Sequence, residues 1–256
     1  MYFPKVSAYC ATYGRPRILE EAIESFIRQD YKGEKELIIL NDCPYHELYI
    51  DHPEVKVFNL KKKIHLLGEK FNNTIDLCSG EILFAWEDDD IYLPHRISYT
   101  INKMFENKKN IFHTRMGYVE VEKTKIISAL KYWGIFPLFH SNLAIYKSAF
   151  KQAGGYLETD DLELDQLTIN KFFKQEKYNS EKINLDNMFY IYRLNNNSYH
   201  AISLKTNLSK KAEDYVKNDN KIFGRYKLKP HWAYDYSRYV ERQNNKRTKL
   251  FRPIIN

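Results

Sequence analysis

The chain contains few cysteines and no long apolar segment. Its three cysteines are an odd number without metal-type spacing, so we expect buried thiols in a reducing compartment. No apolar run approaches the roughly 20 residues that cross a bilayer, and the first residues lack the basic and apolar regions of a secretion signal. These absences predict a cytoplasmic protein, free or peripheral to a membrane, without a transmembrane segment.

Most of the chain has no excess of positive charge. We also find no internal repeat and no low-complexity linker. Residues 205–256 carry 14 Lys or Arg against 5 Asp or Glu, whereas residues 1–204 carry 26 against 28. Aromatic residues such as Trp232 and Tyr236 are spaced along the basic part. We therefore expect a domain over residues 1–204 and a basic, aromatic-rich extension over 205–256 whose helices pack on it.

Apolar segments of two kinds alternate along the domain. Runs rich in β-branched, aromatic or continuous apolar residues predict strands at 5–13, 36–42, 55–60 and 81–87. Amphipathic segments predict helices at 14–29 and 68–78. Strands separated by such helices indicate an α/β fold, with a Rossmann-like, mostly parallel central sheet flanked by helices. Ligands of such sheets bind beyond the carboxyl ends of the strands.

Acidic residues are concentrated at one of those strand ends. The stretch "FAWEDDDIYLPHRI" places four consecutive carboxylates, residues 87–90, directly after an apolar strand, and Asp42 ends another. Carboxylates packed so closely repel one another unless solvent or a cation takes up their field. Oxygen ligands favour Mg²⁺ or Mn²⁺ over zinc. The alternative is an exposed acidic turn that caps the helix expected to begin near Pro94.

Three segments, in this order, resemble the family 2 glycosyltransferases of the GT-A fold. They are "VSAYCATYGRPRILEEAIESFIRQDYKGEKELIILND", "LGEKFNNTIDLCSGEILFAWEDDDIYLPHRI" and "SNLAIYKSAFKQAGGYLETDDLELDQL". Together they cover roughly residues 4–200. The resemblance implies an enzyme that uses a nucleotide-sugar donor, with a donor half at about 1–97, an acceptor half at about 98–204 and a basic helical C-terminal extension.

The resemblance places donor contacts in three parts of the first half. Thr12, Tyr13 and Arg15 fall where the family's first loop lines the nucleotide, and Asp42 falls where a carboxylate binds the base or ribose. Asn72 lies in the family's Asn-containing helix. Two of these side chains have simpler interpretations. Asp42 can cap a turn, and Asn72 can be a surface polar residue.

The metal motif follows by the same resemblance. Asp88 matches the position that faces the ribose, and Asp89 matches the main metal ligand. Glu87, where many members have Asp, and Asp90 leave the register of the motif open, so either pair of acids can touch the ion. His200 resembles a late histidine that completes the metal site in some members, although a lone histidine is more often structural.

The acceptor side is expected in the third segment. Asp165 matches the general base that removes a proton from the acceptor hydroxyl, and its alternative is the solvated face of a helix. Gly154 and Gly155 predict a turn that needs positive φ and brings backbone close to the acceptor. The rival acids on this side are Asp160, Asp161 and Glu163.

One base and one metal site predict metal-dependent, in-line transfer with inversion at the anomeric carbon. The expected partners are a nucleoside-diphosphate sugar, with UDP favoured, and a glycan or lipid-linked acceptor. The basic extension also suits an anionic membrane surface or modified DNA, or it is simply a solvated face. Two alternatives remain: a non-catalytic nucleotide- or glycan-binding module, and a sugar nucleotidyltransferase. The latter would usually have a Gly-rich, lysine-bearing loop, of which "TYGRPR" is a poor version.

Overall fold

The computed structural model describes residues 2–121, 125–161, 163–193 and 224–236. A six-stranded sheet forms its centre, in the order β4-β2-β1-β5-β10-β7. The strands of this sheet are β1 (Val6–Thr12), β2 (Lys35–Asn41), β4 (Val55–Asn59), β5 (Ile82–Ala85), β7 (Ile111–Phe112) and β10 (Ala144–Tyr146). The first four in the sheet order are parallel, and β10 runs antiparallel to both β5 and β7. The predicted mostly parallel α/β sheet is confirmed.

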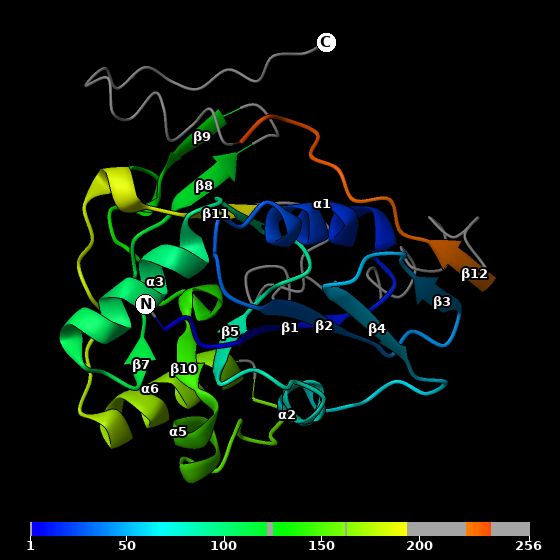
Figure 1. The fold of residues 1–256 in the computed structure, drawn as a ribbon, viewed down its shortest axis with the longest axis horizontal. Coiled ribbons are helices and arrows are strands. Elements are labelled where there is room, and N and C mark those ends of the chain that lie inside the picture. The colour runs from blue at the N-terminus through cyan, green and yellow to red at the C-terminus, as the bar shows by residue number, and fades with distance from the viewer. Residues whose placement is uncertain (1, 122–124, 162, 194–223, 237–256) are drawn as a thin grey trace.

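Helices cover both faces of this sheet (Figure 1). They are α1 (Pro16–Ile27), α2 (Leu67–Asp76), α3 (Arg96–Asn107), α5 (Lys147–Gln152) and α6 (Leu164–Glu176). Alternate residues of β1 explain the two layers, because successive side chains of a strand point to opposite faces. Val6 and Ala8 share an apolar cluster with α1, whereas Tyr9 shares the other cluster with α2 and α6. Every residue of β1 is therefore buried.

A second, four-stranded sheet lies beside the end of β5. It has the order β6-β11-β8-β9 and consists of β6 (Ile91–Tyr92), β8 (Tyr118–Val121), β9 (Lys125–Ser128) and β11 (Tyr190–Arg193). Strand β6 follows the acidic segment directly, and β11 pairs antiparallel with it. The pairing of β11 with β6 therefore brings residues about a hundred positions apart next to the acidic segment.

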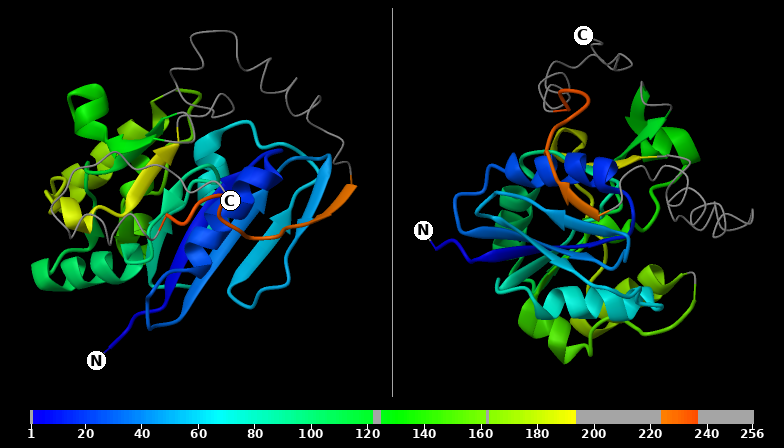
Figure 2. Two further views of the ribbon diagram at one scale, coloured as in Figure 1. Left: turned by 90° about the horizontal axis from the view of Figure 1, so that it is seen from above. Right: turned by 90° about the vertical axis from the view of Figure 1, so that its right-hand side faces the viewer.

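The described part of the C-terminal extension, residues 224–236, is called the strap below. It begins with β12 (Gly224–Lys227), which pairs in parallel with β3 (His46–Tyr49), and then crosses over α1 (Figure 2). Trp232 Nε1 donates a hydrogen bond to Ser25 Oγ of α1 at 3.0 Å, and the Arg28 guanidinium lies 4.6 Å from the Trp232 ring centre.

The expected packing of the extension on the domain is thus confirmed for the strap. The expected helical structure is wrong there, because this segment forms a strand and an irregular crossing. The physical reason is the backbone of β3, whose hydrogen-bonding groups are paired by β12 in a separate two-stranded sheet. The rest of the extension, residues 205–223 and 237–256, lies outside the described residues.

Several local expectations are confirmed. Pro16 lies in the first turn of α1, and the three cysteines, Cys10, Cys43 and Cys78, are buried free thiols. Gly154 and Gly155 have φ of 73° and 65°, as the predicted turn requires. None of the helices in the described ranges combines the length and apolar character needed to span a membrane.

Candidate active site

The carboxyl ends of β2, β1 and β5 meet at one edge of the central sheet, because β1 pairs with both neighbours in parallel. Lys70 of α2 connects two of these ends. Its Nζ donates to the backbone oxygen of Thr12 at 2.7 Å and pairs with Asp42 Oδ1 at 2.5 Å. The other Asp42 oxygen accepts from the Ile64 amide at 2.9 Å. Asp42 is therefore a buried, fully engaged carboxylate at the edge where a ligand is expected.

Arg15, at the start of α1, holds two acids of the acidic segment. Its guanidinium pairs with Asp88 and, at 2.8 Å from Nη1 to Oδ2, with Asp89. Thr12 Oγ1 donates to the second Asp88 oxygen at 2.6 Å. Burial raises the pKa of Asp88 to about 6, although the positive charge of Arg15 acts in the opposite direction. Two of the predicted donor residues of the first loop, Thr12 and Arg15, thus contact the acidic segment directly.

Asp90 has a different environment from its neighbours. One of its oxygens accepts from Tyr190 Oη at 2.6 Å, and the other accepts from the backbone amide of Arg193 at 3.0 Å. Burial, reinforced by the charge of Asp89, raises the pKa of this carboxyl well above its ordinary value. Asp90 therefore joins the acidic segment to β11 and lies only 2% exposed, so it is poorly placed to meet a ligand.

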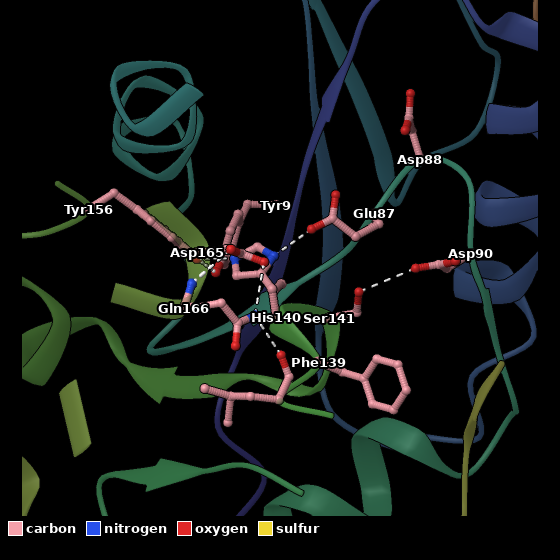
Figure 3. A network of polar contacts seen from close by, with 12 residues as sticks. Tyr9, Glu87, Asp88, Asp90, Phe139, His140, Ser141, Tyr156, Asp165 and Gln166 are labelled. Atoms are coloured by element: carbon pink, nitrogen blue, oxygen red, sulfur yellow. Dashed lines mark hydrogen bonds and ion pairs between the residues drawn. The ribbon is translucent and has the colours of Figure 1, made fainter. Parts of the chain in front are cut away.

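Glu87 turns away from the Arg15 pair toward the acceptor half of the chain (Figure 3). It contacts His140 Nδ1, while His140 Nε2 lies 2.5 Å from Tyr156 Oη. The Tyr156 hydroxyl in turn lies 2.5 Å from Tyr9 Oη. Burial disfavours the charged imidazole, but the carboxylates of Glu87 and then Asp165 outweigh it and raise the pKa of His140. The four consecutive acids are therefore tolerated because they have three sets of partners: His140 for Glu87, Arg15 for Asp88 and Asp89, and Tyr190 with the Arg193 amide for Asp90.

Asp165 lies in the first turn of α6, beside His140 (Figure 3). Its Oδ2 accepts from Gln166 Nε2 at 3.2 Å, and Gln166 also donates to the backbone oxygen of Leu138 at 2.7 Å. The side chain is partly exposed. The rival Glu163 is exposed, and its backbone amide donates to Asp161 Oδ1 at 2.8 Å. Among the predicted acids of this segment, Asp165 is the one that acts on His140.

Asn72 connects α2 to the turn that contains Gly155. Its Oδ1 accepts from the Tyr156 amide at 2.9 Å, and its Nδ2 donates to the Tyr156 backbone oxygen at 3.1 Å. A β-carbon at Gly155 would lie 2.8 Å from Asn72 Oδ1, so the close approach requires glycine. Asn72 was expected to face the donor. The structure places it against the acceptor-side turn, and a contact with the donor stays a prediction.

Three residues of the site were not identified from the sequence: Lys70, His140 and Arg193. Each has partners that are distant along the chain, so its local sequence does not point to the site. Lys70 alone had a usable signal, since a lysine on the inward face of an amphipathic helix needs a buried anion. Trp86, next to the acidic segment, packs in the core, with its ring centre 5.6 Å from that of Phe26.

The carboxylate oxygens of the acidic segment provide only part of a site for a hard divalent cation. Asp89 uses one oxygen for Arg15, and no described residue donates to its other oxygen. Its side chain is 14% exposed, against 1% for Asp88, whose two oxygens are both engaged. A group of three His, Cys, Asp or Glu ligands is absent from the described residues, and His200 lies outside them. Of the two carboxylates that share Arg15, Asp89 is thus the more accessible to a ligand.

This combination of fold and site is that of a GT-A transferase: a parallel sheet, an acidic segment after β5 and a carboxylate facing it from α6. The sequence comparison agrees, since residues 7–161 match Glycosyl transferase family 2. The chain belongs to this family.

Relatives and solved structures show the same likeness. The chain is 29% identical over 203 residues to the GalNAc(5)-diNAcBac-PP-undecaprenol beta-1,3-glucosyltransferase of Campylobacter jejuni, which covers 74% of this chain and 63% of that protein. It is 29% identical over 102 residues to the putative colanic acid biosynthesis glycosyl transferase WcaA of Escherichia coli, covering 37% and 36%. The chain thus spans less than two thirds of these curated relatives.

Two solved structures share the fold. TarS 1–349 of S. aureus in complex with UDP-GlcNAc has a TM-score of 0.57 and 17% identity, covering 76% of this chain and 60% of that one. The mannosyltransferase PcManGT of Pyrobaculum calidifontis, in complex with GDP-Man and Mn²⁺, has a TM-score of 0.58 and 15% identity, covering 86% and 72%. At these identities the likeness concerns the fold.

Proposed function

We propose that the protein transfers a sugar from a nucleoside-diphosphate sugar, with UDP the favoured nucleotide, to a hydroxyl of a glycan or lipid-linked acceptor. The observation that carries the proposal is that two carboxylates from distant parts of the chain lie near the same histidine at one edge of the sheet. Asp165 of α6 and Glu87 of the acidic segment both act on His140. The UDP-GlcNAc complex of TarS supports the donor class, and the name of the C. jejuni relative supports a lipid-linked acceptor.

The donor half, about residues 1–97, would bind the nucleotide. The end of β1 and the start of α1 carry Thr12, Tyr13 and Arg15. Lys70 contacts both the Thr12 backbone oxygen and Asp42, so Asp42 lies close to this loop. A divalent ion, Mn²⁺ or Mg²⁺, held mainly by Asp89 with Asp88 beside it, would stabilise the negative charge of the departing diphosphate. The Mn²⁺ complex of PcManGT supports an ion of this kind. His200 remains a prediction as a further ligand.

The acceptor half, about residues 98–204, would supply the base. The Asp165 carboxylate takes the proton of the acceptor hydroxyl as its oxygen attacks the anomeric carbon. Gln166 holds one carboxylate oxygen, so that the side chain keeps a fixed direction. Attack opposite the leaving diphosphate inverts the anomeric configuration. The turn at Gly154 and Gly155, with Glu163 further along the segment, would border the acceptor.

The test uses three single variants: Asp165→Asn, Asp89→Asn and, as a surface control, Asp76→Asn, whose side chain is exposed. UDP release from UDP-sugars is measured with Mn²⁺ and with chelator, together with UDP binding. Loss of the general base lowers transfer by about 10²- to 10⁴-fold with UDP binding intact. Loss of Asp89 removes the metal-dependent part of UDP binding. The control variant keeps both.

Other outcomes would overturn the proposal in distinct ways. Release of pyrophosphate would indicate nucleotidyl transfer, and UDP binding without turnover would indicate a binding module. Parental transfer rates in Asp165→Asn would remove the base assignment, and a product of retained configuration by proton NMR would remove the inverting mechanism. The proposed boundary at residue 204 and most of the basic extension, residues 205–223 and 237–256, lie outside the described residues.

A further inference from the structure

We propose that His140 is a positioning residue for Glu87: its imidazole fixes this carboxylate toward the acceptor half, where one free oxygen orients a hydroxyl of the donor sugar. The inference rests on the proposed function. It concerns a contact between a short 3-10 turn, η1 (His140–Asn142), and the first acid of the acidic segment.

The geometry around Glu87 leaves one oxygen for a substrate. Its backbone amide donates to Tyr92 Oη at 2.8 Å, and its Oε1 contacts His140 Nδ1. No described residue donates to Oε2. The Glu87 side chain is 26% exposed, whereas that of His140 is 5% exposed. One Glu87 oxygen is therefore held by a buried imidazole, and the other is available to a substrate. Substrate-binding side chains are commonly held in this way by a buried neighbour.

The His140 imidazole is fixed by hydrogen bonds at both nitrogens and by an aromatic neighbour. Its Nε2 lies 2.5 Å from Tyr156 Oη, and the Phe71 ring centre lies 5.0 Å from its own. Tyr156 reaches back to Tyr9 of β1 and, through its backbone, to Asn72 of α2. Glu87, Tyr156 and Phe71 thus contact the ring directly, so a change in its direction would disturb well-packed neighbours.

The direction of the hydrogen bond to Glu87 does not depend on the charge of the ring. In the neutral imidazole, Nδ1–H donates to Glu87, and Nε2 accepts from the Tyr156 hydroxyl. In the imidazolium, both nitrogens donate, and the Tyr156 hydroxyl donates to Tyr9. Either state keeps Glu87 away from the carboxylates that share Arg15, which would otherwise repel it.

Two amide substitutions separate the two ring contacts. His140→Asn places a donor near the position of Nδ1 and can still hold Glu87. His140→Gln places its donor near the position of Nε2, toward Tyr156. If positioning of Glu87 matters, His140→Asn keeps transfer within about tenfold of the parent, whereas His140→Gln loses about 100-fold in kcat, the scale of a roughly 1 Å misplacement. Binding of UDP without its sugar stays unchanged in both.

A purely structural role gives another pattern. Activity would then fall in step with the melting temperature in both variants, and Glu87→Gln would lower activity by the same factor in the parent as in His140→Gln. Either result, or better activity in His140→Gln than in His140→Asn, overturns the proposal. Positioning instead predicts that Glu87→Gln costs little once His140 is already Gln.

A spectroscopic readout covers the case in which the enzyme assay fails. In ¹⁵N-histidine spectra, the His140 signals are assigned by their loss in His140→Gln. Glu87→Gln is expected to shift the Nδ1 signal, and Tyr156→Phe the Nε2 signal. Unchanged Nδ1 in Glu87→Gln contradicts the contact itself. A protein that shows the shifts but binds no nucleotide would refute the proposed function and, with it, a donor role for Glu87.

Discussion

Arg193 Nη1 lies 2.9 Å from Glu21 Oε1, and this ion pair joins the end of β11 to the middle of α1. The same guanidinium donates through Nε to the backbone oxygen of Asp89, and the Arg193 amide donates to Asp90. The second oxygen of Glu21 accepts from Ala233 of the strap at 3.4 Å. Arg193 therefore contacts the acidic segment directly. Glu21 links Arg193 to the strap, because it contacts both Arg193 and Ala233.

Replacing Arg193 with lysine should weaken the site while the charge is kept. A lysine cannot contact Asp89 and Glu21 together, because it lacks the planar fork of the guanidinium. We expect Arg193→Lys to raise the Mn²⁺ concentration needed for half-maximal UDP release by about 10- to 100-fold. The control is Lys103→Gln, which removes the exposed ion pair of α3 with Glu106 and should change neither activity nor stability measurably. Equal Mn²⁺ curves for parent and Arg193→Lys contradict the role.

The buried pair of Lys70 and Asp42 should show strong coupling. Lys70→Met leaves a buried carboxylate without its cation, so we expect the free energy of unfolding to fall by about 3–5 kcal/mol in urea titrations. In the double variant Lys70→Met/Asp42→Asn the loss should be much smaller, because no uncompensated charge remains. Additive losses in the double variant would show that the two side chains do not interact.

Stability at low pH should depend on Glu36. Burial opposes its ionisation, but hydrogen bonds from Lys56, Ser79 and Ser7 outweigh burial and lower its pKa from 4.5 to about 2. A folded-state pKa below the unfolded value contributes stability above pH 4.5, and this contribution is lost as the pH falls toward 2.

We therefore expect Glu36→Gln to melt below the parent at pH 7, with a difference of about 1–2 kcal/mol in unfolding free energy from lost charge-assisted hydrogen bonds. The difference should shrink as the pH falls from 4.5 to 2, measured by thermal or urea unfolding. Exposed Glu34→Gln serves as the control with little effect at any pH. A constant gap between Glu36→Gln and the parent across this range would be evidence against the ionised, hydrogen-bonded carboxylate.

The two glycines of the acceptor-side turn should respond differently to alanine. Both have positive φ, which costs an alanine about 1–2 kcal/mol. Gly154→Ala meets no atom within 4 Å, whereas Gly155→Ala meets Asn72 Oδ1 at 2.8 Å. Gly155→Ala should therefore lose about 1 kcal/mol more in unfolding free energy, because Asn72 must release the Tyr156 amide. It should also lower kcat, while Gly154→Ala keeps it. Similar values for both variants would contradict the close approach.

Part of this structure follows from local sequence, and part does not. The continuous apolar runs of β2 and β5 predict buried strands because both faces of a parallel sheet are covered. The strap was predicted to be helical from its spaced aromatics. It instead pairs with β3, a strand of four residues nearly 180 positions earlier, and no local pattern encodes that pairing.

The site divides in the same way. The sequence by itself determined the alternation of strands and helices, the accumulation of acids after β5 and a carboxylate near the start of α6, since these depend on residue type and spacing along the chain. The tertiary structure alone decided that Asp90 faces inward, that Arg15 holds Asp88 and Asp89, and that His140 meets Glu87. The reason is physical: a carboxylate's role depends on burial and on the charges around it, and those are supplied by residues brought close only when the chain folds.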